Sequence, residues 1–181
     1  MTNTHTTAAL KKLIVWARDN NISETNIPSC VDTLVSLEKL SLYNLNLSNL
    51  PDEIGALKNL KELYLPSNRF EKIPNVVYSL KNLEVLWVHD NCISEIPQEI
   101  LQLVNLRELV AFSNNIVEIP NLWELQKLNY LVLSYNRLSK EIVHKFEVEF
   151  KGDFCAIEQK EIDLFYVEPL SNATLEKASA L

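Results

Sequence analysis

Apolar residues recur along this chain at intervals that fit neither one long helix nor one long strand. Five prolines stand at positions 28, 51, 74, 97 and 120, each 23 residues after the last and each preceded by Leu or Ile. Four further sets of residues recur with the same period, three of them apolar and one of asparagines. They are Leu37, Leu60, Leu83, Leu106 and Leu128; Leu40, Leu63, Leu86, Leu109 and Leu131; Leu42, Leu65, Val88, Ala111 and Leu133; and Asn68, Asn91, Asn114 and Asn136. The period-two LxLx run predicts a short strand, and the spacing after each proline predicts a 3-10 or short helical turn.

Written out, the unit is LxxLxLxxNxLxxLPxxIxxLxN, and the fourth unit is one residue shorter because NLWELQKL replaces its usual spacing. With units such as LKELYLPSNRFEKIPNVVYSLKN, residues 27–138 resemble the leucine-rich repeat family. The resemblance implies an α/β fold, a right-handed curved solenoid of about five repeats. It also implies a parallel sheet on the concave face and 3-10 or short helical segments on the convex side.

Physical reasoning agrees with that architecture. Each strand buries a single leucine layer, so neighbouring units must stack to complete a core. The recurring asparagines are expected to bond to backbone groups of their own and adjacent turns. Position 45 is Leu where the first full repeat should carry Asn, which we interpret as the end of that ladder.

Both ends of the solenoid are expected to be covered by helices, an N-terminal cap over residues 1–26 and a C-terminal cap and tail over residues 139–181. Residues 8–18 predict an amphipathic helix with Thr6 or Thr7 as its N-cap, and its apolar face carries Leu10, Leu13, Ile14 and Ala17. Ser139 predicts the start of a helix that runs to about Lys151, with Gly152 beyond it; its apolar face carries Ile142, Phe146 and Phe150. The stretch IDLFYVEPL predicts an extended segment, and the last residues are expected to fray.

Outward-pointing strand residues would line the concave surface and face solvent. They are unusually aromatic for a chain with 8% Phe, Trp and Tyr. We expect a partner-binding patch there, because exposed aromatic clusters mark protein contacts. Its candidate residues are Tyr43, Tyr64, Trp87, His89, Val110, Phe112, Tyr130 and Val132. Two plainer explanations stay open: aromatic residues simply suit strands, or the C-terminal tail folds back across the concave face.

Composition narrows the classes of partner. The formal net charge of -7 without a basic patch argues against nucleic acid. Two glycines cannot build a phosphate-cradling loop, and no cofactor is expected. Three scattered cysteines favour a reducing cytoplasm, with export by a route that leaves no cleaved signal as the alternative. No segment has the length of apolar sequence that crosses a membrane.

We expect a binding protein and not an enzyme. His89 and Cys92 are close in sequence, but a nucleophile needs a base that converges on it, and these two residues are expected on different faces. The three histidines are far apart, so no metal site is expected. The alternatives are a homodimer or scaffold, and the recognition subunit of an enzyme or secreted effector. The sequence names no partner.

Overall fold

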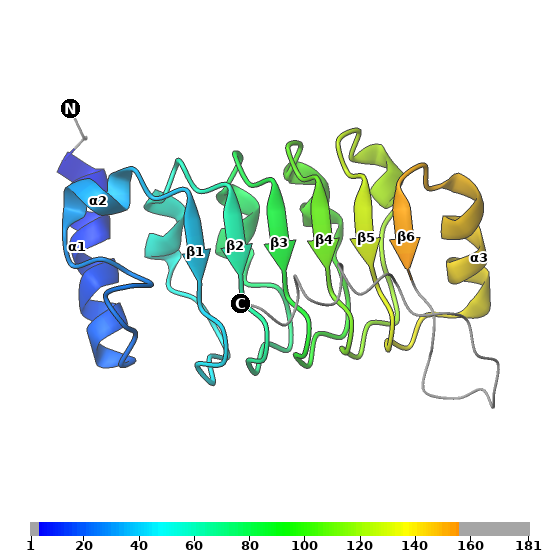
Figure 1. Cartoon of the computed structure of the whole chain (residues 1–181), viewed down its shortest axis with the longest axis horizontal. Coiled ribbons are helices and arrows are strands. Elements are labelled where there is room, and N and C mark those ends of the chain that lie inside the picture. Colours follow the sequence, from blue (N-terminus) through cyan, green and yellow to red (C-terminus); the bar gives the residue numbers. More distant parts are fainter. Residues whose placement is uncertain (1–3, 156–181) are drawn as a thin grey trace.

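Six short strands lie side by side in one parallel sheet, in chain order, in the computed structural model of the protein (Figure 1), which describes residues 4–155. The strands are β1 (Lys39–Ser41), β2 (Glu62–Tyr64), β3 (Val85–Trp87), β4 (Glu108–Val110), β5 (Tyr130–Val132) and β6 (Asp153–Cys155). Equivalent repeat positions pair directly, so that Leu63 lies opposite Leu86. The parallel sheet expected from the repeat is confirmed.

The prolines that recur every 23 residues precede the short helical segments behind the sheet. These segments are α2 (Val31–Val35), η1 (Asp52–Ala56), η2 (Asn75–Ser79), η3 (Gln98–Gln102) and η4 (Leu122–Glu124). Pro51, Pro74 and Pro97 are the N-cap residues of η1, η2 and η3, where a missing N–H leaves no helical bond unmade. The shorter fourth unit has the shorter segment, η4, which spans three residues where the other 3-10 helices span five.

The core consists of the stacked leucine columns between the sheet and these segments. The column that includes Leu40, Leu63 and Leu86 has no exposed surface in any repeat. Because each layer is completed only by the layers beside it, the repeats stabilise one another as a continuous stack.

The N-terminal cap is a single helix, α1 (Thr4–Asp19), packed against η1. Leu10, Leu13 and Ala17 are buried, and Ile14 packs against the same core, which confirms the predicted apolar face. The predicted N-cap is wrong: the helix already includes Thr6 and Thr7.

The C-terminal end differs from the expectation of a cap alone. Helix α3 (Lys140–Glu149) begins as predicted after Ser139, whose hydroxyl oxygen accepts the Ile142 N–H at 3.2 Å, and it ends before Lys151. The chain then returns to the sheet as β6, where Phe154 pairs with Leu131. The extended segment predicted within IDLFYVEPL lies outside the described residues.

Gly152 is the residue that lets β6 approach the sheet. A Cβ atom at this position would collide with the backbone carbonyl of Asn129, and the Asp153 N–H donates to that same carbonyl oxygen at 2.8 Å. A backbone approach this close requires glycine.

Candidate partner-binding surface

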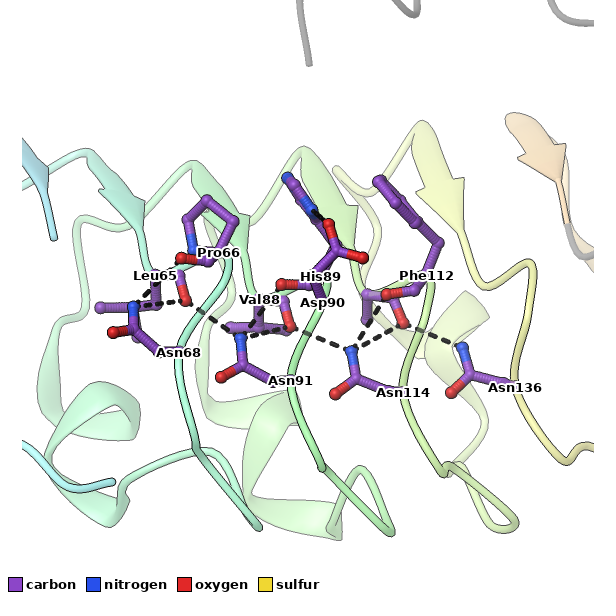
Figure 2. A network of polar contacts seen from close by, with 11 residues as sticks. Leu65, Pro66, Asn68, Val88, His89, Asp90, Asn91, Phe112, Asn114 and Asn136 are labelled. Carbon is purple, nitrogen blue, oxygen red and sulfur yellow. Dashed lines mark hydrogen bonds and ion pairs between the residues drawn. The ribbon is translucent and has the colours of Figure 1, made fainter. Parts of the chain in front are cut away.

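A ladder of buried asparagines fixes the turns that follow the strands (Figure 2). Asn91 is typical: its Oδ1 accepts the Phe70 N–H at 3.0 Å, and its Nδ2 donates to Leu65 O and Val88 O, each at 3.0 Å. Asn68, Asn114 and Asn136 repeat this pattern. Because each amide joins two repeats, the ladder holds neighbouring strand ends in one register.

The ladder begins at Asn68, which also explains Leu45. Asn68 Oδ1 accepts the N–H groups of both Leu45 and Leu47, at 3.1 and 3.0 Å. The Leu45 side chain is half-buried against the core. The first turn therefore needs no asparagine of its own.

A residue with left-handed backbone precedes each position of the ladder column. These residues are Asn44, Ser67, Asp90, Ser113 and Tyr135, with φ between 52° and 54°, and none is glycine. The conformation is costly for residues with a Cβ atom. After Ser67, Asp90, Ser113 and Tyr135 it persists because the asparagine that follows bonds to carbonyls just before the turn, as Asn91 does to Val88 O and His89 O. After Asn44 the Leu45 N–H donates to Asn68 Oδ1 instead.

The concave surface is defined here by the outward-facing residues of β1–β5 and by the residues two positions beyond each strand's end. It carries a chain of ring contacts across three repeats. Tyr64 packs edge-on against Trp87 with ring centroids 5.0 Å apart, and Trp87 lies 6.1 Å from His89. The His89 ring stacks on Phe112 at 4.3 Å. The structure thus brings the predicted residues of β2 to β5 together, while Tyr43 lies at the β1 end.

Burial of this surface is deeper than the sequence led us to expect. Trp87 is 7% exposed and His89 4% exposed. Trp87 forms a second apolar cluster on the outer face of the sheet with the buried Tyr64, Val110 and Val132, and the partly buried Phe112 and Tyr130 pack against it. Tyr43 alone among the predicted residues is strongly exposed, at 46%. The expectation that all of them face solvent is therefore wrong for the middle of the surface.

Within residues 4–155, two buried ring nitrogens of this surface have no hydrogen-bond partner, Nε1 of Trp87 and Nε2 of His89. His89 Nδ1 lies 2.8 Å from Asp90 Oδ2. Burial lowers the pKa of His89, although the Asp90 carboxylate opposes the shift, so the ring is neutral near pH 7. A neutral ring that donates Nδ1–H to Asp90 keeps Nε2 as an acceptor.

Charged residues border the aromatic cluster in pairs that join adjacent repeats. Lys61 lies 3.0 Å from Glu38, and Arg107 lies 3.2 Å from Glu84. The Tyr64 hydroxyl donates to Glu62 at 2.9 Å, and burial together with this carboxylate raises the pKa of Tyr64. The exposed pairs add little stability, but they give the surface a polar border.

The described part of the chain was also searched for a metal site, a membrane-spanning helix and a Cys–His catalytic pair. Residues 4–155 contain no cluster of His, Cys, Asp and Glu that could hold a metal ion, and none of their helices is long and apolar enough to span a bilayer. Cys92 is exposed whereas His89 is buried and engaged with Asp90.

A second asparagine column was not assigned a role from sequence. Asn59, Asn82 and Asn105 each donate Nδ2–H to a backbone carbonyl of the preceding repeat at 2.8 Å, on the exposed side of the loops. These residues occupy the last position of the repeat unit, and that recurrence was the signal for their role.

Comparisons with known proteins agree with the repeat architecture. The family described as leucine-rich repeat region matches residues 9–172. A search of curated proteins found no match. A leucine-rich repeat protein of Leptospira interrogans is 32% identical with a TM-score of 0.63, over 68% of this chain and 32% of its own.

Two further solved structures are similar. Internalin C2 of Listeria monocytogenes is 23% identical with a TM-score of 0.58, over 76% of this chain and 57% of its own, and it supports the fold alone. The leucine-rich repeat ectodomain of the receptor kinase SOBIR1 of Arabidopsis thaliana is 30% identical with a TM-score of 0.52, over 65% of this chain and 67% of its own. From its repeat, its sheet and the family match over most of its length, this chain belongs to the leucine-rich repeat family.

Proposed function

We propose that this protein binds another protein through its concave surface, as a recognition module without catalytic activity of its own. The observation that carries the proposal is the continuous row of rings from Tyr64 through Trp87 and His89 to Phe112. Large aromatic side chains that are held rigidly dominate the energetics of protein interfaces. Membership of a family of solenoids, which offer extended concave binding surfaces, supports the same role.

Rigidity gives this surface its value as a binding site. Tyr64 and Trp87 stand on strands that are paired on both sides, and the asparagine ladder bonds to the backbone carbonyls of His89 and Phe112 in the turns that follow. A surface that is already ordered loses little conformational entropy when it binds. The proposed contact residues are Tyr43, Phe112 and Tyr130 at the accessible margins, with Tyr64, Trp87, His89, Val110 and Val132 behind them.

Affinity capture from the lysate of the native cell tests this function with three baits: the full chain, Tyr43→Ala and Val104→Ala. Val104 is 61% exposed in the turn between η3 and β4, outside the concave surface as defined above, so its variant removes an exposed apolar group that the proposed contact does not include. We expect a specific protein that is retained by Val104→Ala and lost with Tyr43→Ala. Retention by Tyr43→Ala with loss in Val104→Ala would place the site outside the concave surface. Capture of further copies of the chain alone would favour a homodimer.

A further inference from the structure

A groove that is open to solvent runs between η2 and η3, behind the sheet (Figure 1). It has a volume of about 390 Å³ and is lined by Asn75, Tyr78, Ser79, Lys81, Glu99 and Gln102. Sites for small ligands have volumes of about 300–1,000 Å³, so this groove has room for one long side chain. None of its residues belongs to the concave surface, so the groove is a separate candidate site.

Lys81 occupies one end of the groove. Its Nζ donates to Tyr78 O at 2.8 Å and to Gln102 Oε1 at 2.9 Å, and Gln102 is the last residue of η3. The opposite end is formed by Asn75, the first residue of η2, and Glu99, the second residue of η3. The groove is therefore positively charged at one end and negatively charged at the other.

Three side chains of the groove have oxygen atoms that accept no hydrogen bond from residues 4–155, those of Asn75, Tyr78 and Glu99. Tyr78 is only 4% exposed, and its hydroxyl donates to Ile73 O at 3.5 Å, a distance beyond the usual range for O–H···O bonds. Burial, and then the charges of Glu99 and Glu95, raise the pKa of Tyr78, which places both carboxylates near its hydroxyl. The groove thus offers acceptors that lack donors.

The Glu99 carboxylate also has no ion-pair partner in the described part of the chain. Carboxylates beside the sheet differ, since Glu38 pairs with Lys61 at 3.0 Å and Glu84 pairs with Arg107 at 3.2 Å. A ligand that complements the groove is a cation that donates several hydrogen bonds and accepts none. The guanidinium group of arginine has five N–H donors in one plane, has no acceptor and is less strongly hydrated than an ammonium group.

We propose that the groove between η2 and η3 binds an arginine side chain of a protein partner, with its guanidinium group at Glu99, Asn75 and the Tyr78 hydroxyl. Glu99 supplies the opposite charge, the two other oxygens fix the plane of the group, and Lys81 repels it from the far end. Pockets for free small ligands enclose most of the ligand. An open groove leaves the far end of its ligand in solvent, which suits a side chain that extends from another protein. This contact does not depend on binding at the concave surface.

Nuclear magnetic resonance of the 15N-labelled full chain tests the groove, with acetyl-arginine-methylamide as the probe. Acetyl-citrulline-methylamide is the matched probe, because it has nearly the same shape without the charge. We expect the arginine probe to shift the amide resonances of η2 and η3 in a saturable way, and the citrulline probe to leave them in place. Absence of saturable shifts there, or equal binding of both probes, would overturn the proposal. Tighter binding of free arginine than of the blocked probe would overturn the assignment to a protein side chain.

Three variants assign the contact to its residues. Glu99→Gln should weaken binding of the arginine probe about tenfold, the change expected for a charged hydrogen bond, and Tyr78→Phe about threefold. Glu124→Gln is the control, because Glu124 is an exposed carboxylate on η4, outside the groove, and its loss changes the net charge equally. It should bind the probe as the unaltered chain does. Equal binding by Glu99→Gln and Glu124→Gln would overturn the proposal.

Discussion

The substitution Asn91→Ala tests the ladder that holds the concave surface together. It removes the only acceptor that the structure provides for the buried N–H of Phe70. The carbonyls that Asn91 serves are less affected, because Leu65 O keeps its bond from Asn68 and Val88 O keeps its bond from Asn114. An unsatisfied buried N–H costs about 1–3 kcal/mol, and the weakened carbonyl bonds add about 1 kcal/mol. We therefore expect the free energy of unfolding to fall by roughly 2–4 kcal/mol.

Urea unfolding followed by circular dichroism measures this change. Asn82→Ala is the matched control, because Asn82 closes the repeat before that of Asn91 and makes one exposed bond, to Lys58 O at 2.8 Å, which water can replace. Its expected cost is below about 1 kcal/mol. Equal losses in the two variants would refute the reasoning, since the argument depends on burial and not on the number of asparagine bonds.

Three further predictions concern the backbone and the buried histidine. Gly152→Ala should lower the free energy of unfolding by roughly 2 kcal/mol or more, because the added Cβ would collide with the Asn129 backbone. Gly55→Ala is its control: the nearest atom to the added Cβ is the movable Ser79 hydroxyl at 2.9 Å, so the same urea titration should show a smaller loss of stability. Ser113→Gly should raise the free energy of unfolding by about 0.5–1 kcal/mol, because glycine adopts the φ of 52° at this position without strain. Ser94→Gly, at a position without positive φ, should lower the free energy of unfolding. If Ser113→Gly does not raise it, the backbone at Ser113 is not strained. Because burial lowers the pKa of His89 in the folded chain, the unfolded chain binds a proton first as the pH decreases. The free energy of unfolding should therefore fall as the pH decreases from 7.5 past 6.5, and level off below the lowered pKa of the folded state. The variant His89→Gln should lose this part of the pH dependence.

The repeat architecture could be predicted because a period of 23 residues constrains many positions at once. Strand register, the asparagine ladder and the shortened η4 all follow from columns that the sequence displays openly. The sixth strand was missed even though Phe154 stands 23 residues after Leu131. Phe replaces Leu there, no proline or asparagine follows in phase, and an α-helix takes the place of the 3-10 segment.

For the candidate site, the face of the sheet on which its residues lie could be predicted from sequence, but their burial could not. Alternation along the strands placed Tyr64, Trp87 and Val110 on one face, as the structure has them. Their burial was not predictable from alternation, because a period of two distinguishes the faces of a sheet and does not say what covers each face. The N-cap of α1 was misplaced for a similar reason: four threonines in the first seven residues offer equivalent caps, and sequence alone does not choose among them.

The most direct test of partner binding is the dissociation constant of the captured protein for the full chain and for two single variants. Phe112→Ala removes a half-buried ring of the concave surface, and Val104→Ala removes an exposed group from the turn between η3 and β4. We predict that Phe112→Ala weakens binding about tenfold or more, the change expected for an interface anchor worth about 1.4 kcal/mol, while Val104→Ala leaves it unchanged. Unchanged binding by a folded Phe112→Ala variant, together with weaker binding by Val104→Ala, would contradict the assignment of the concave surface as the binding site.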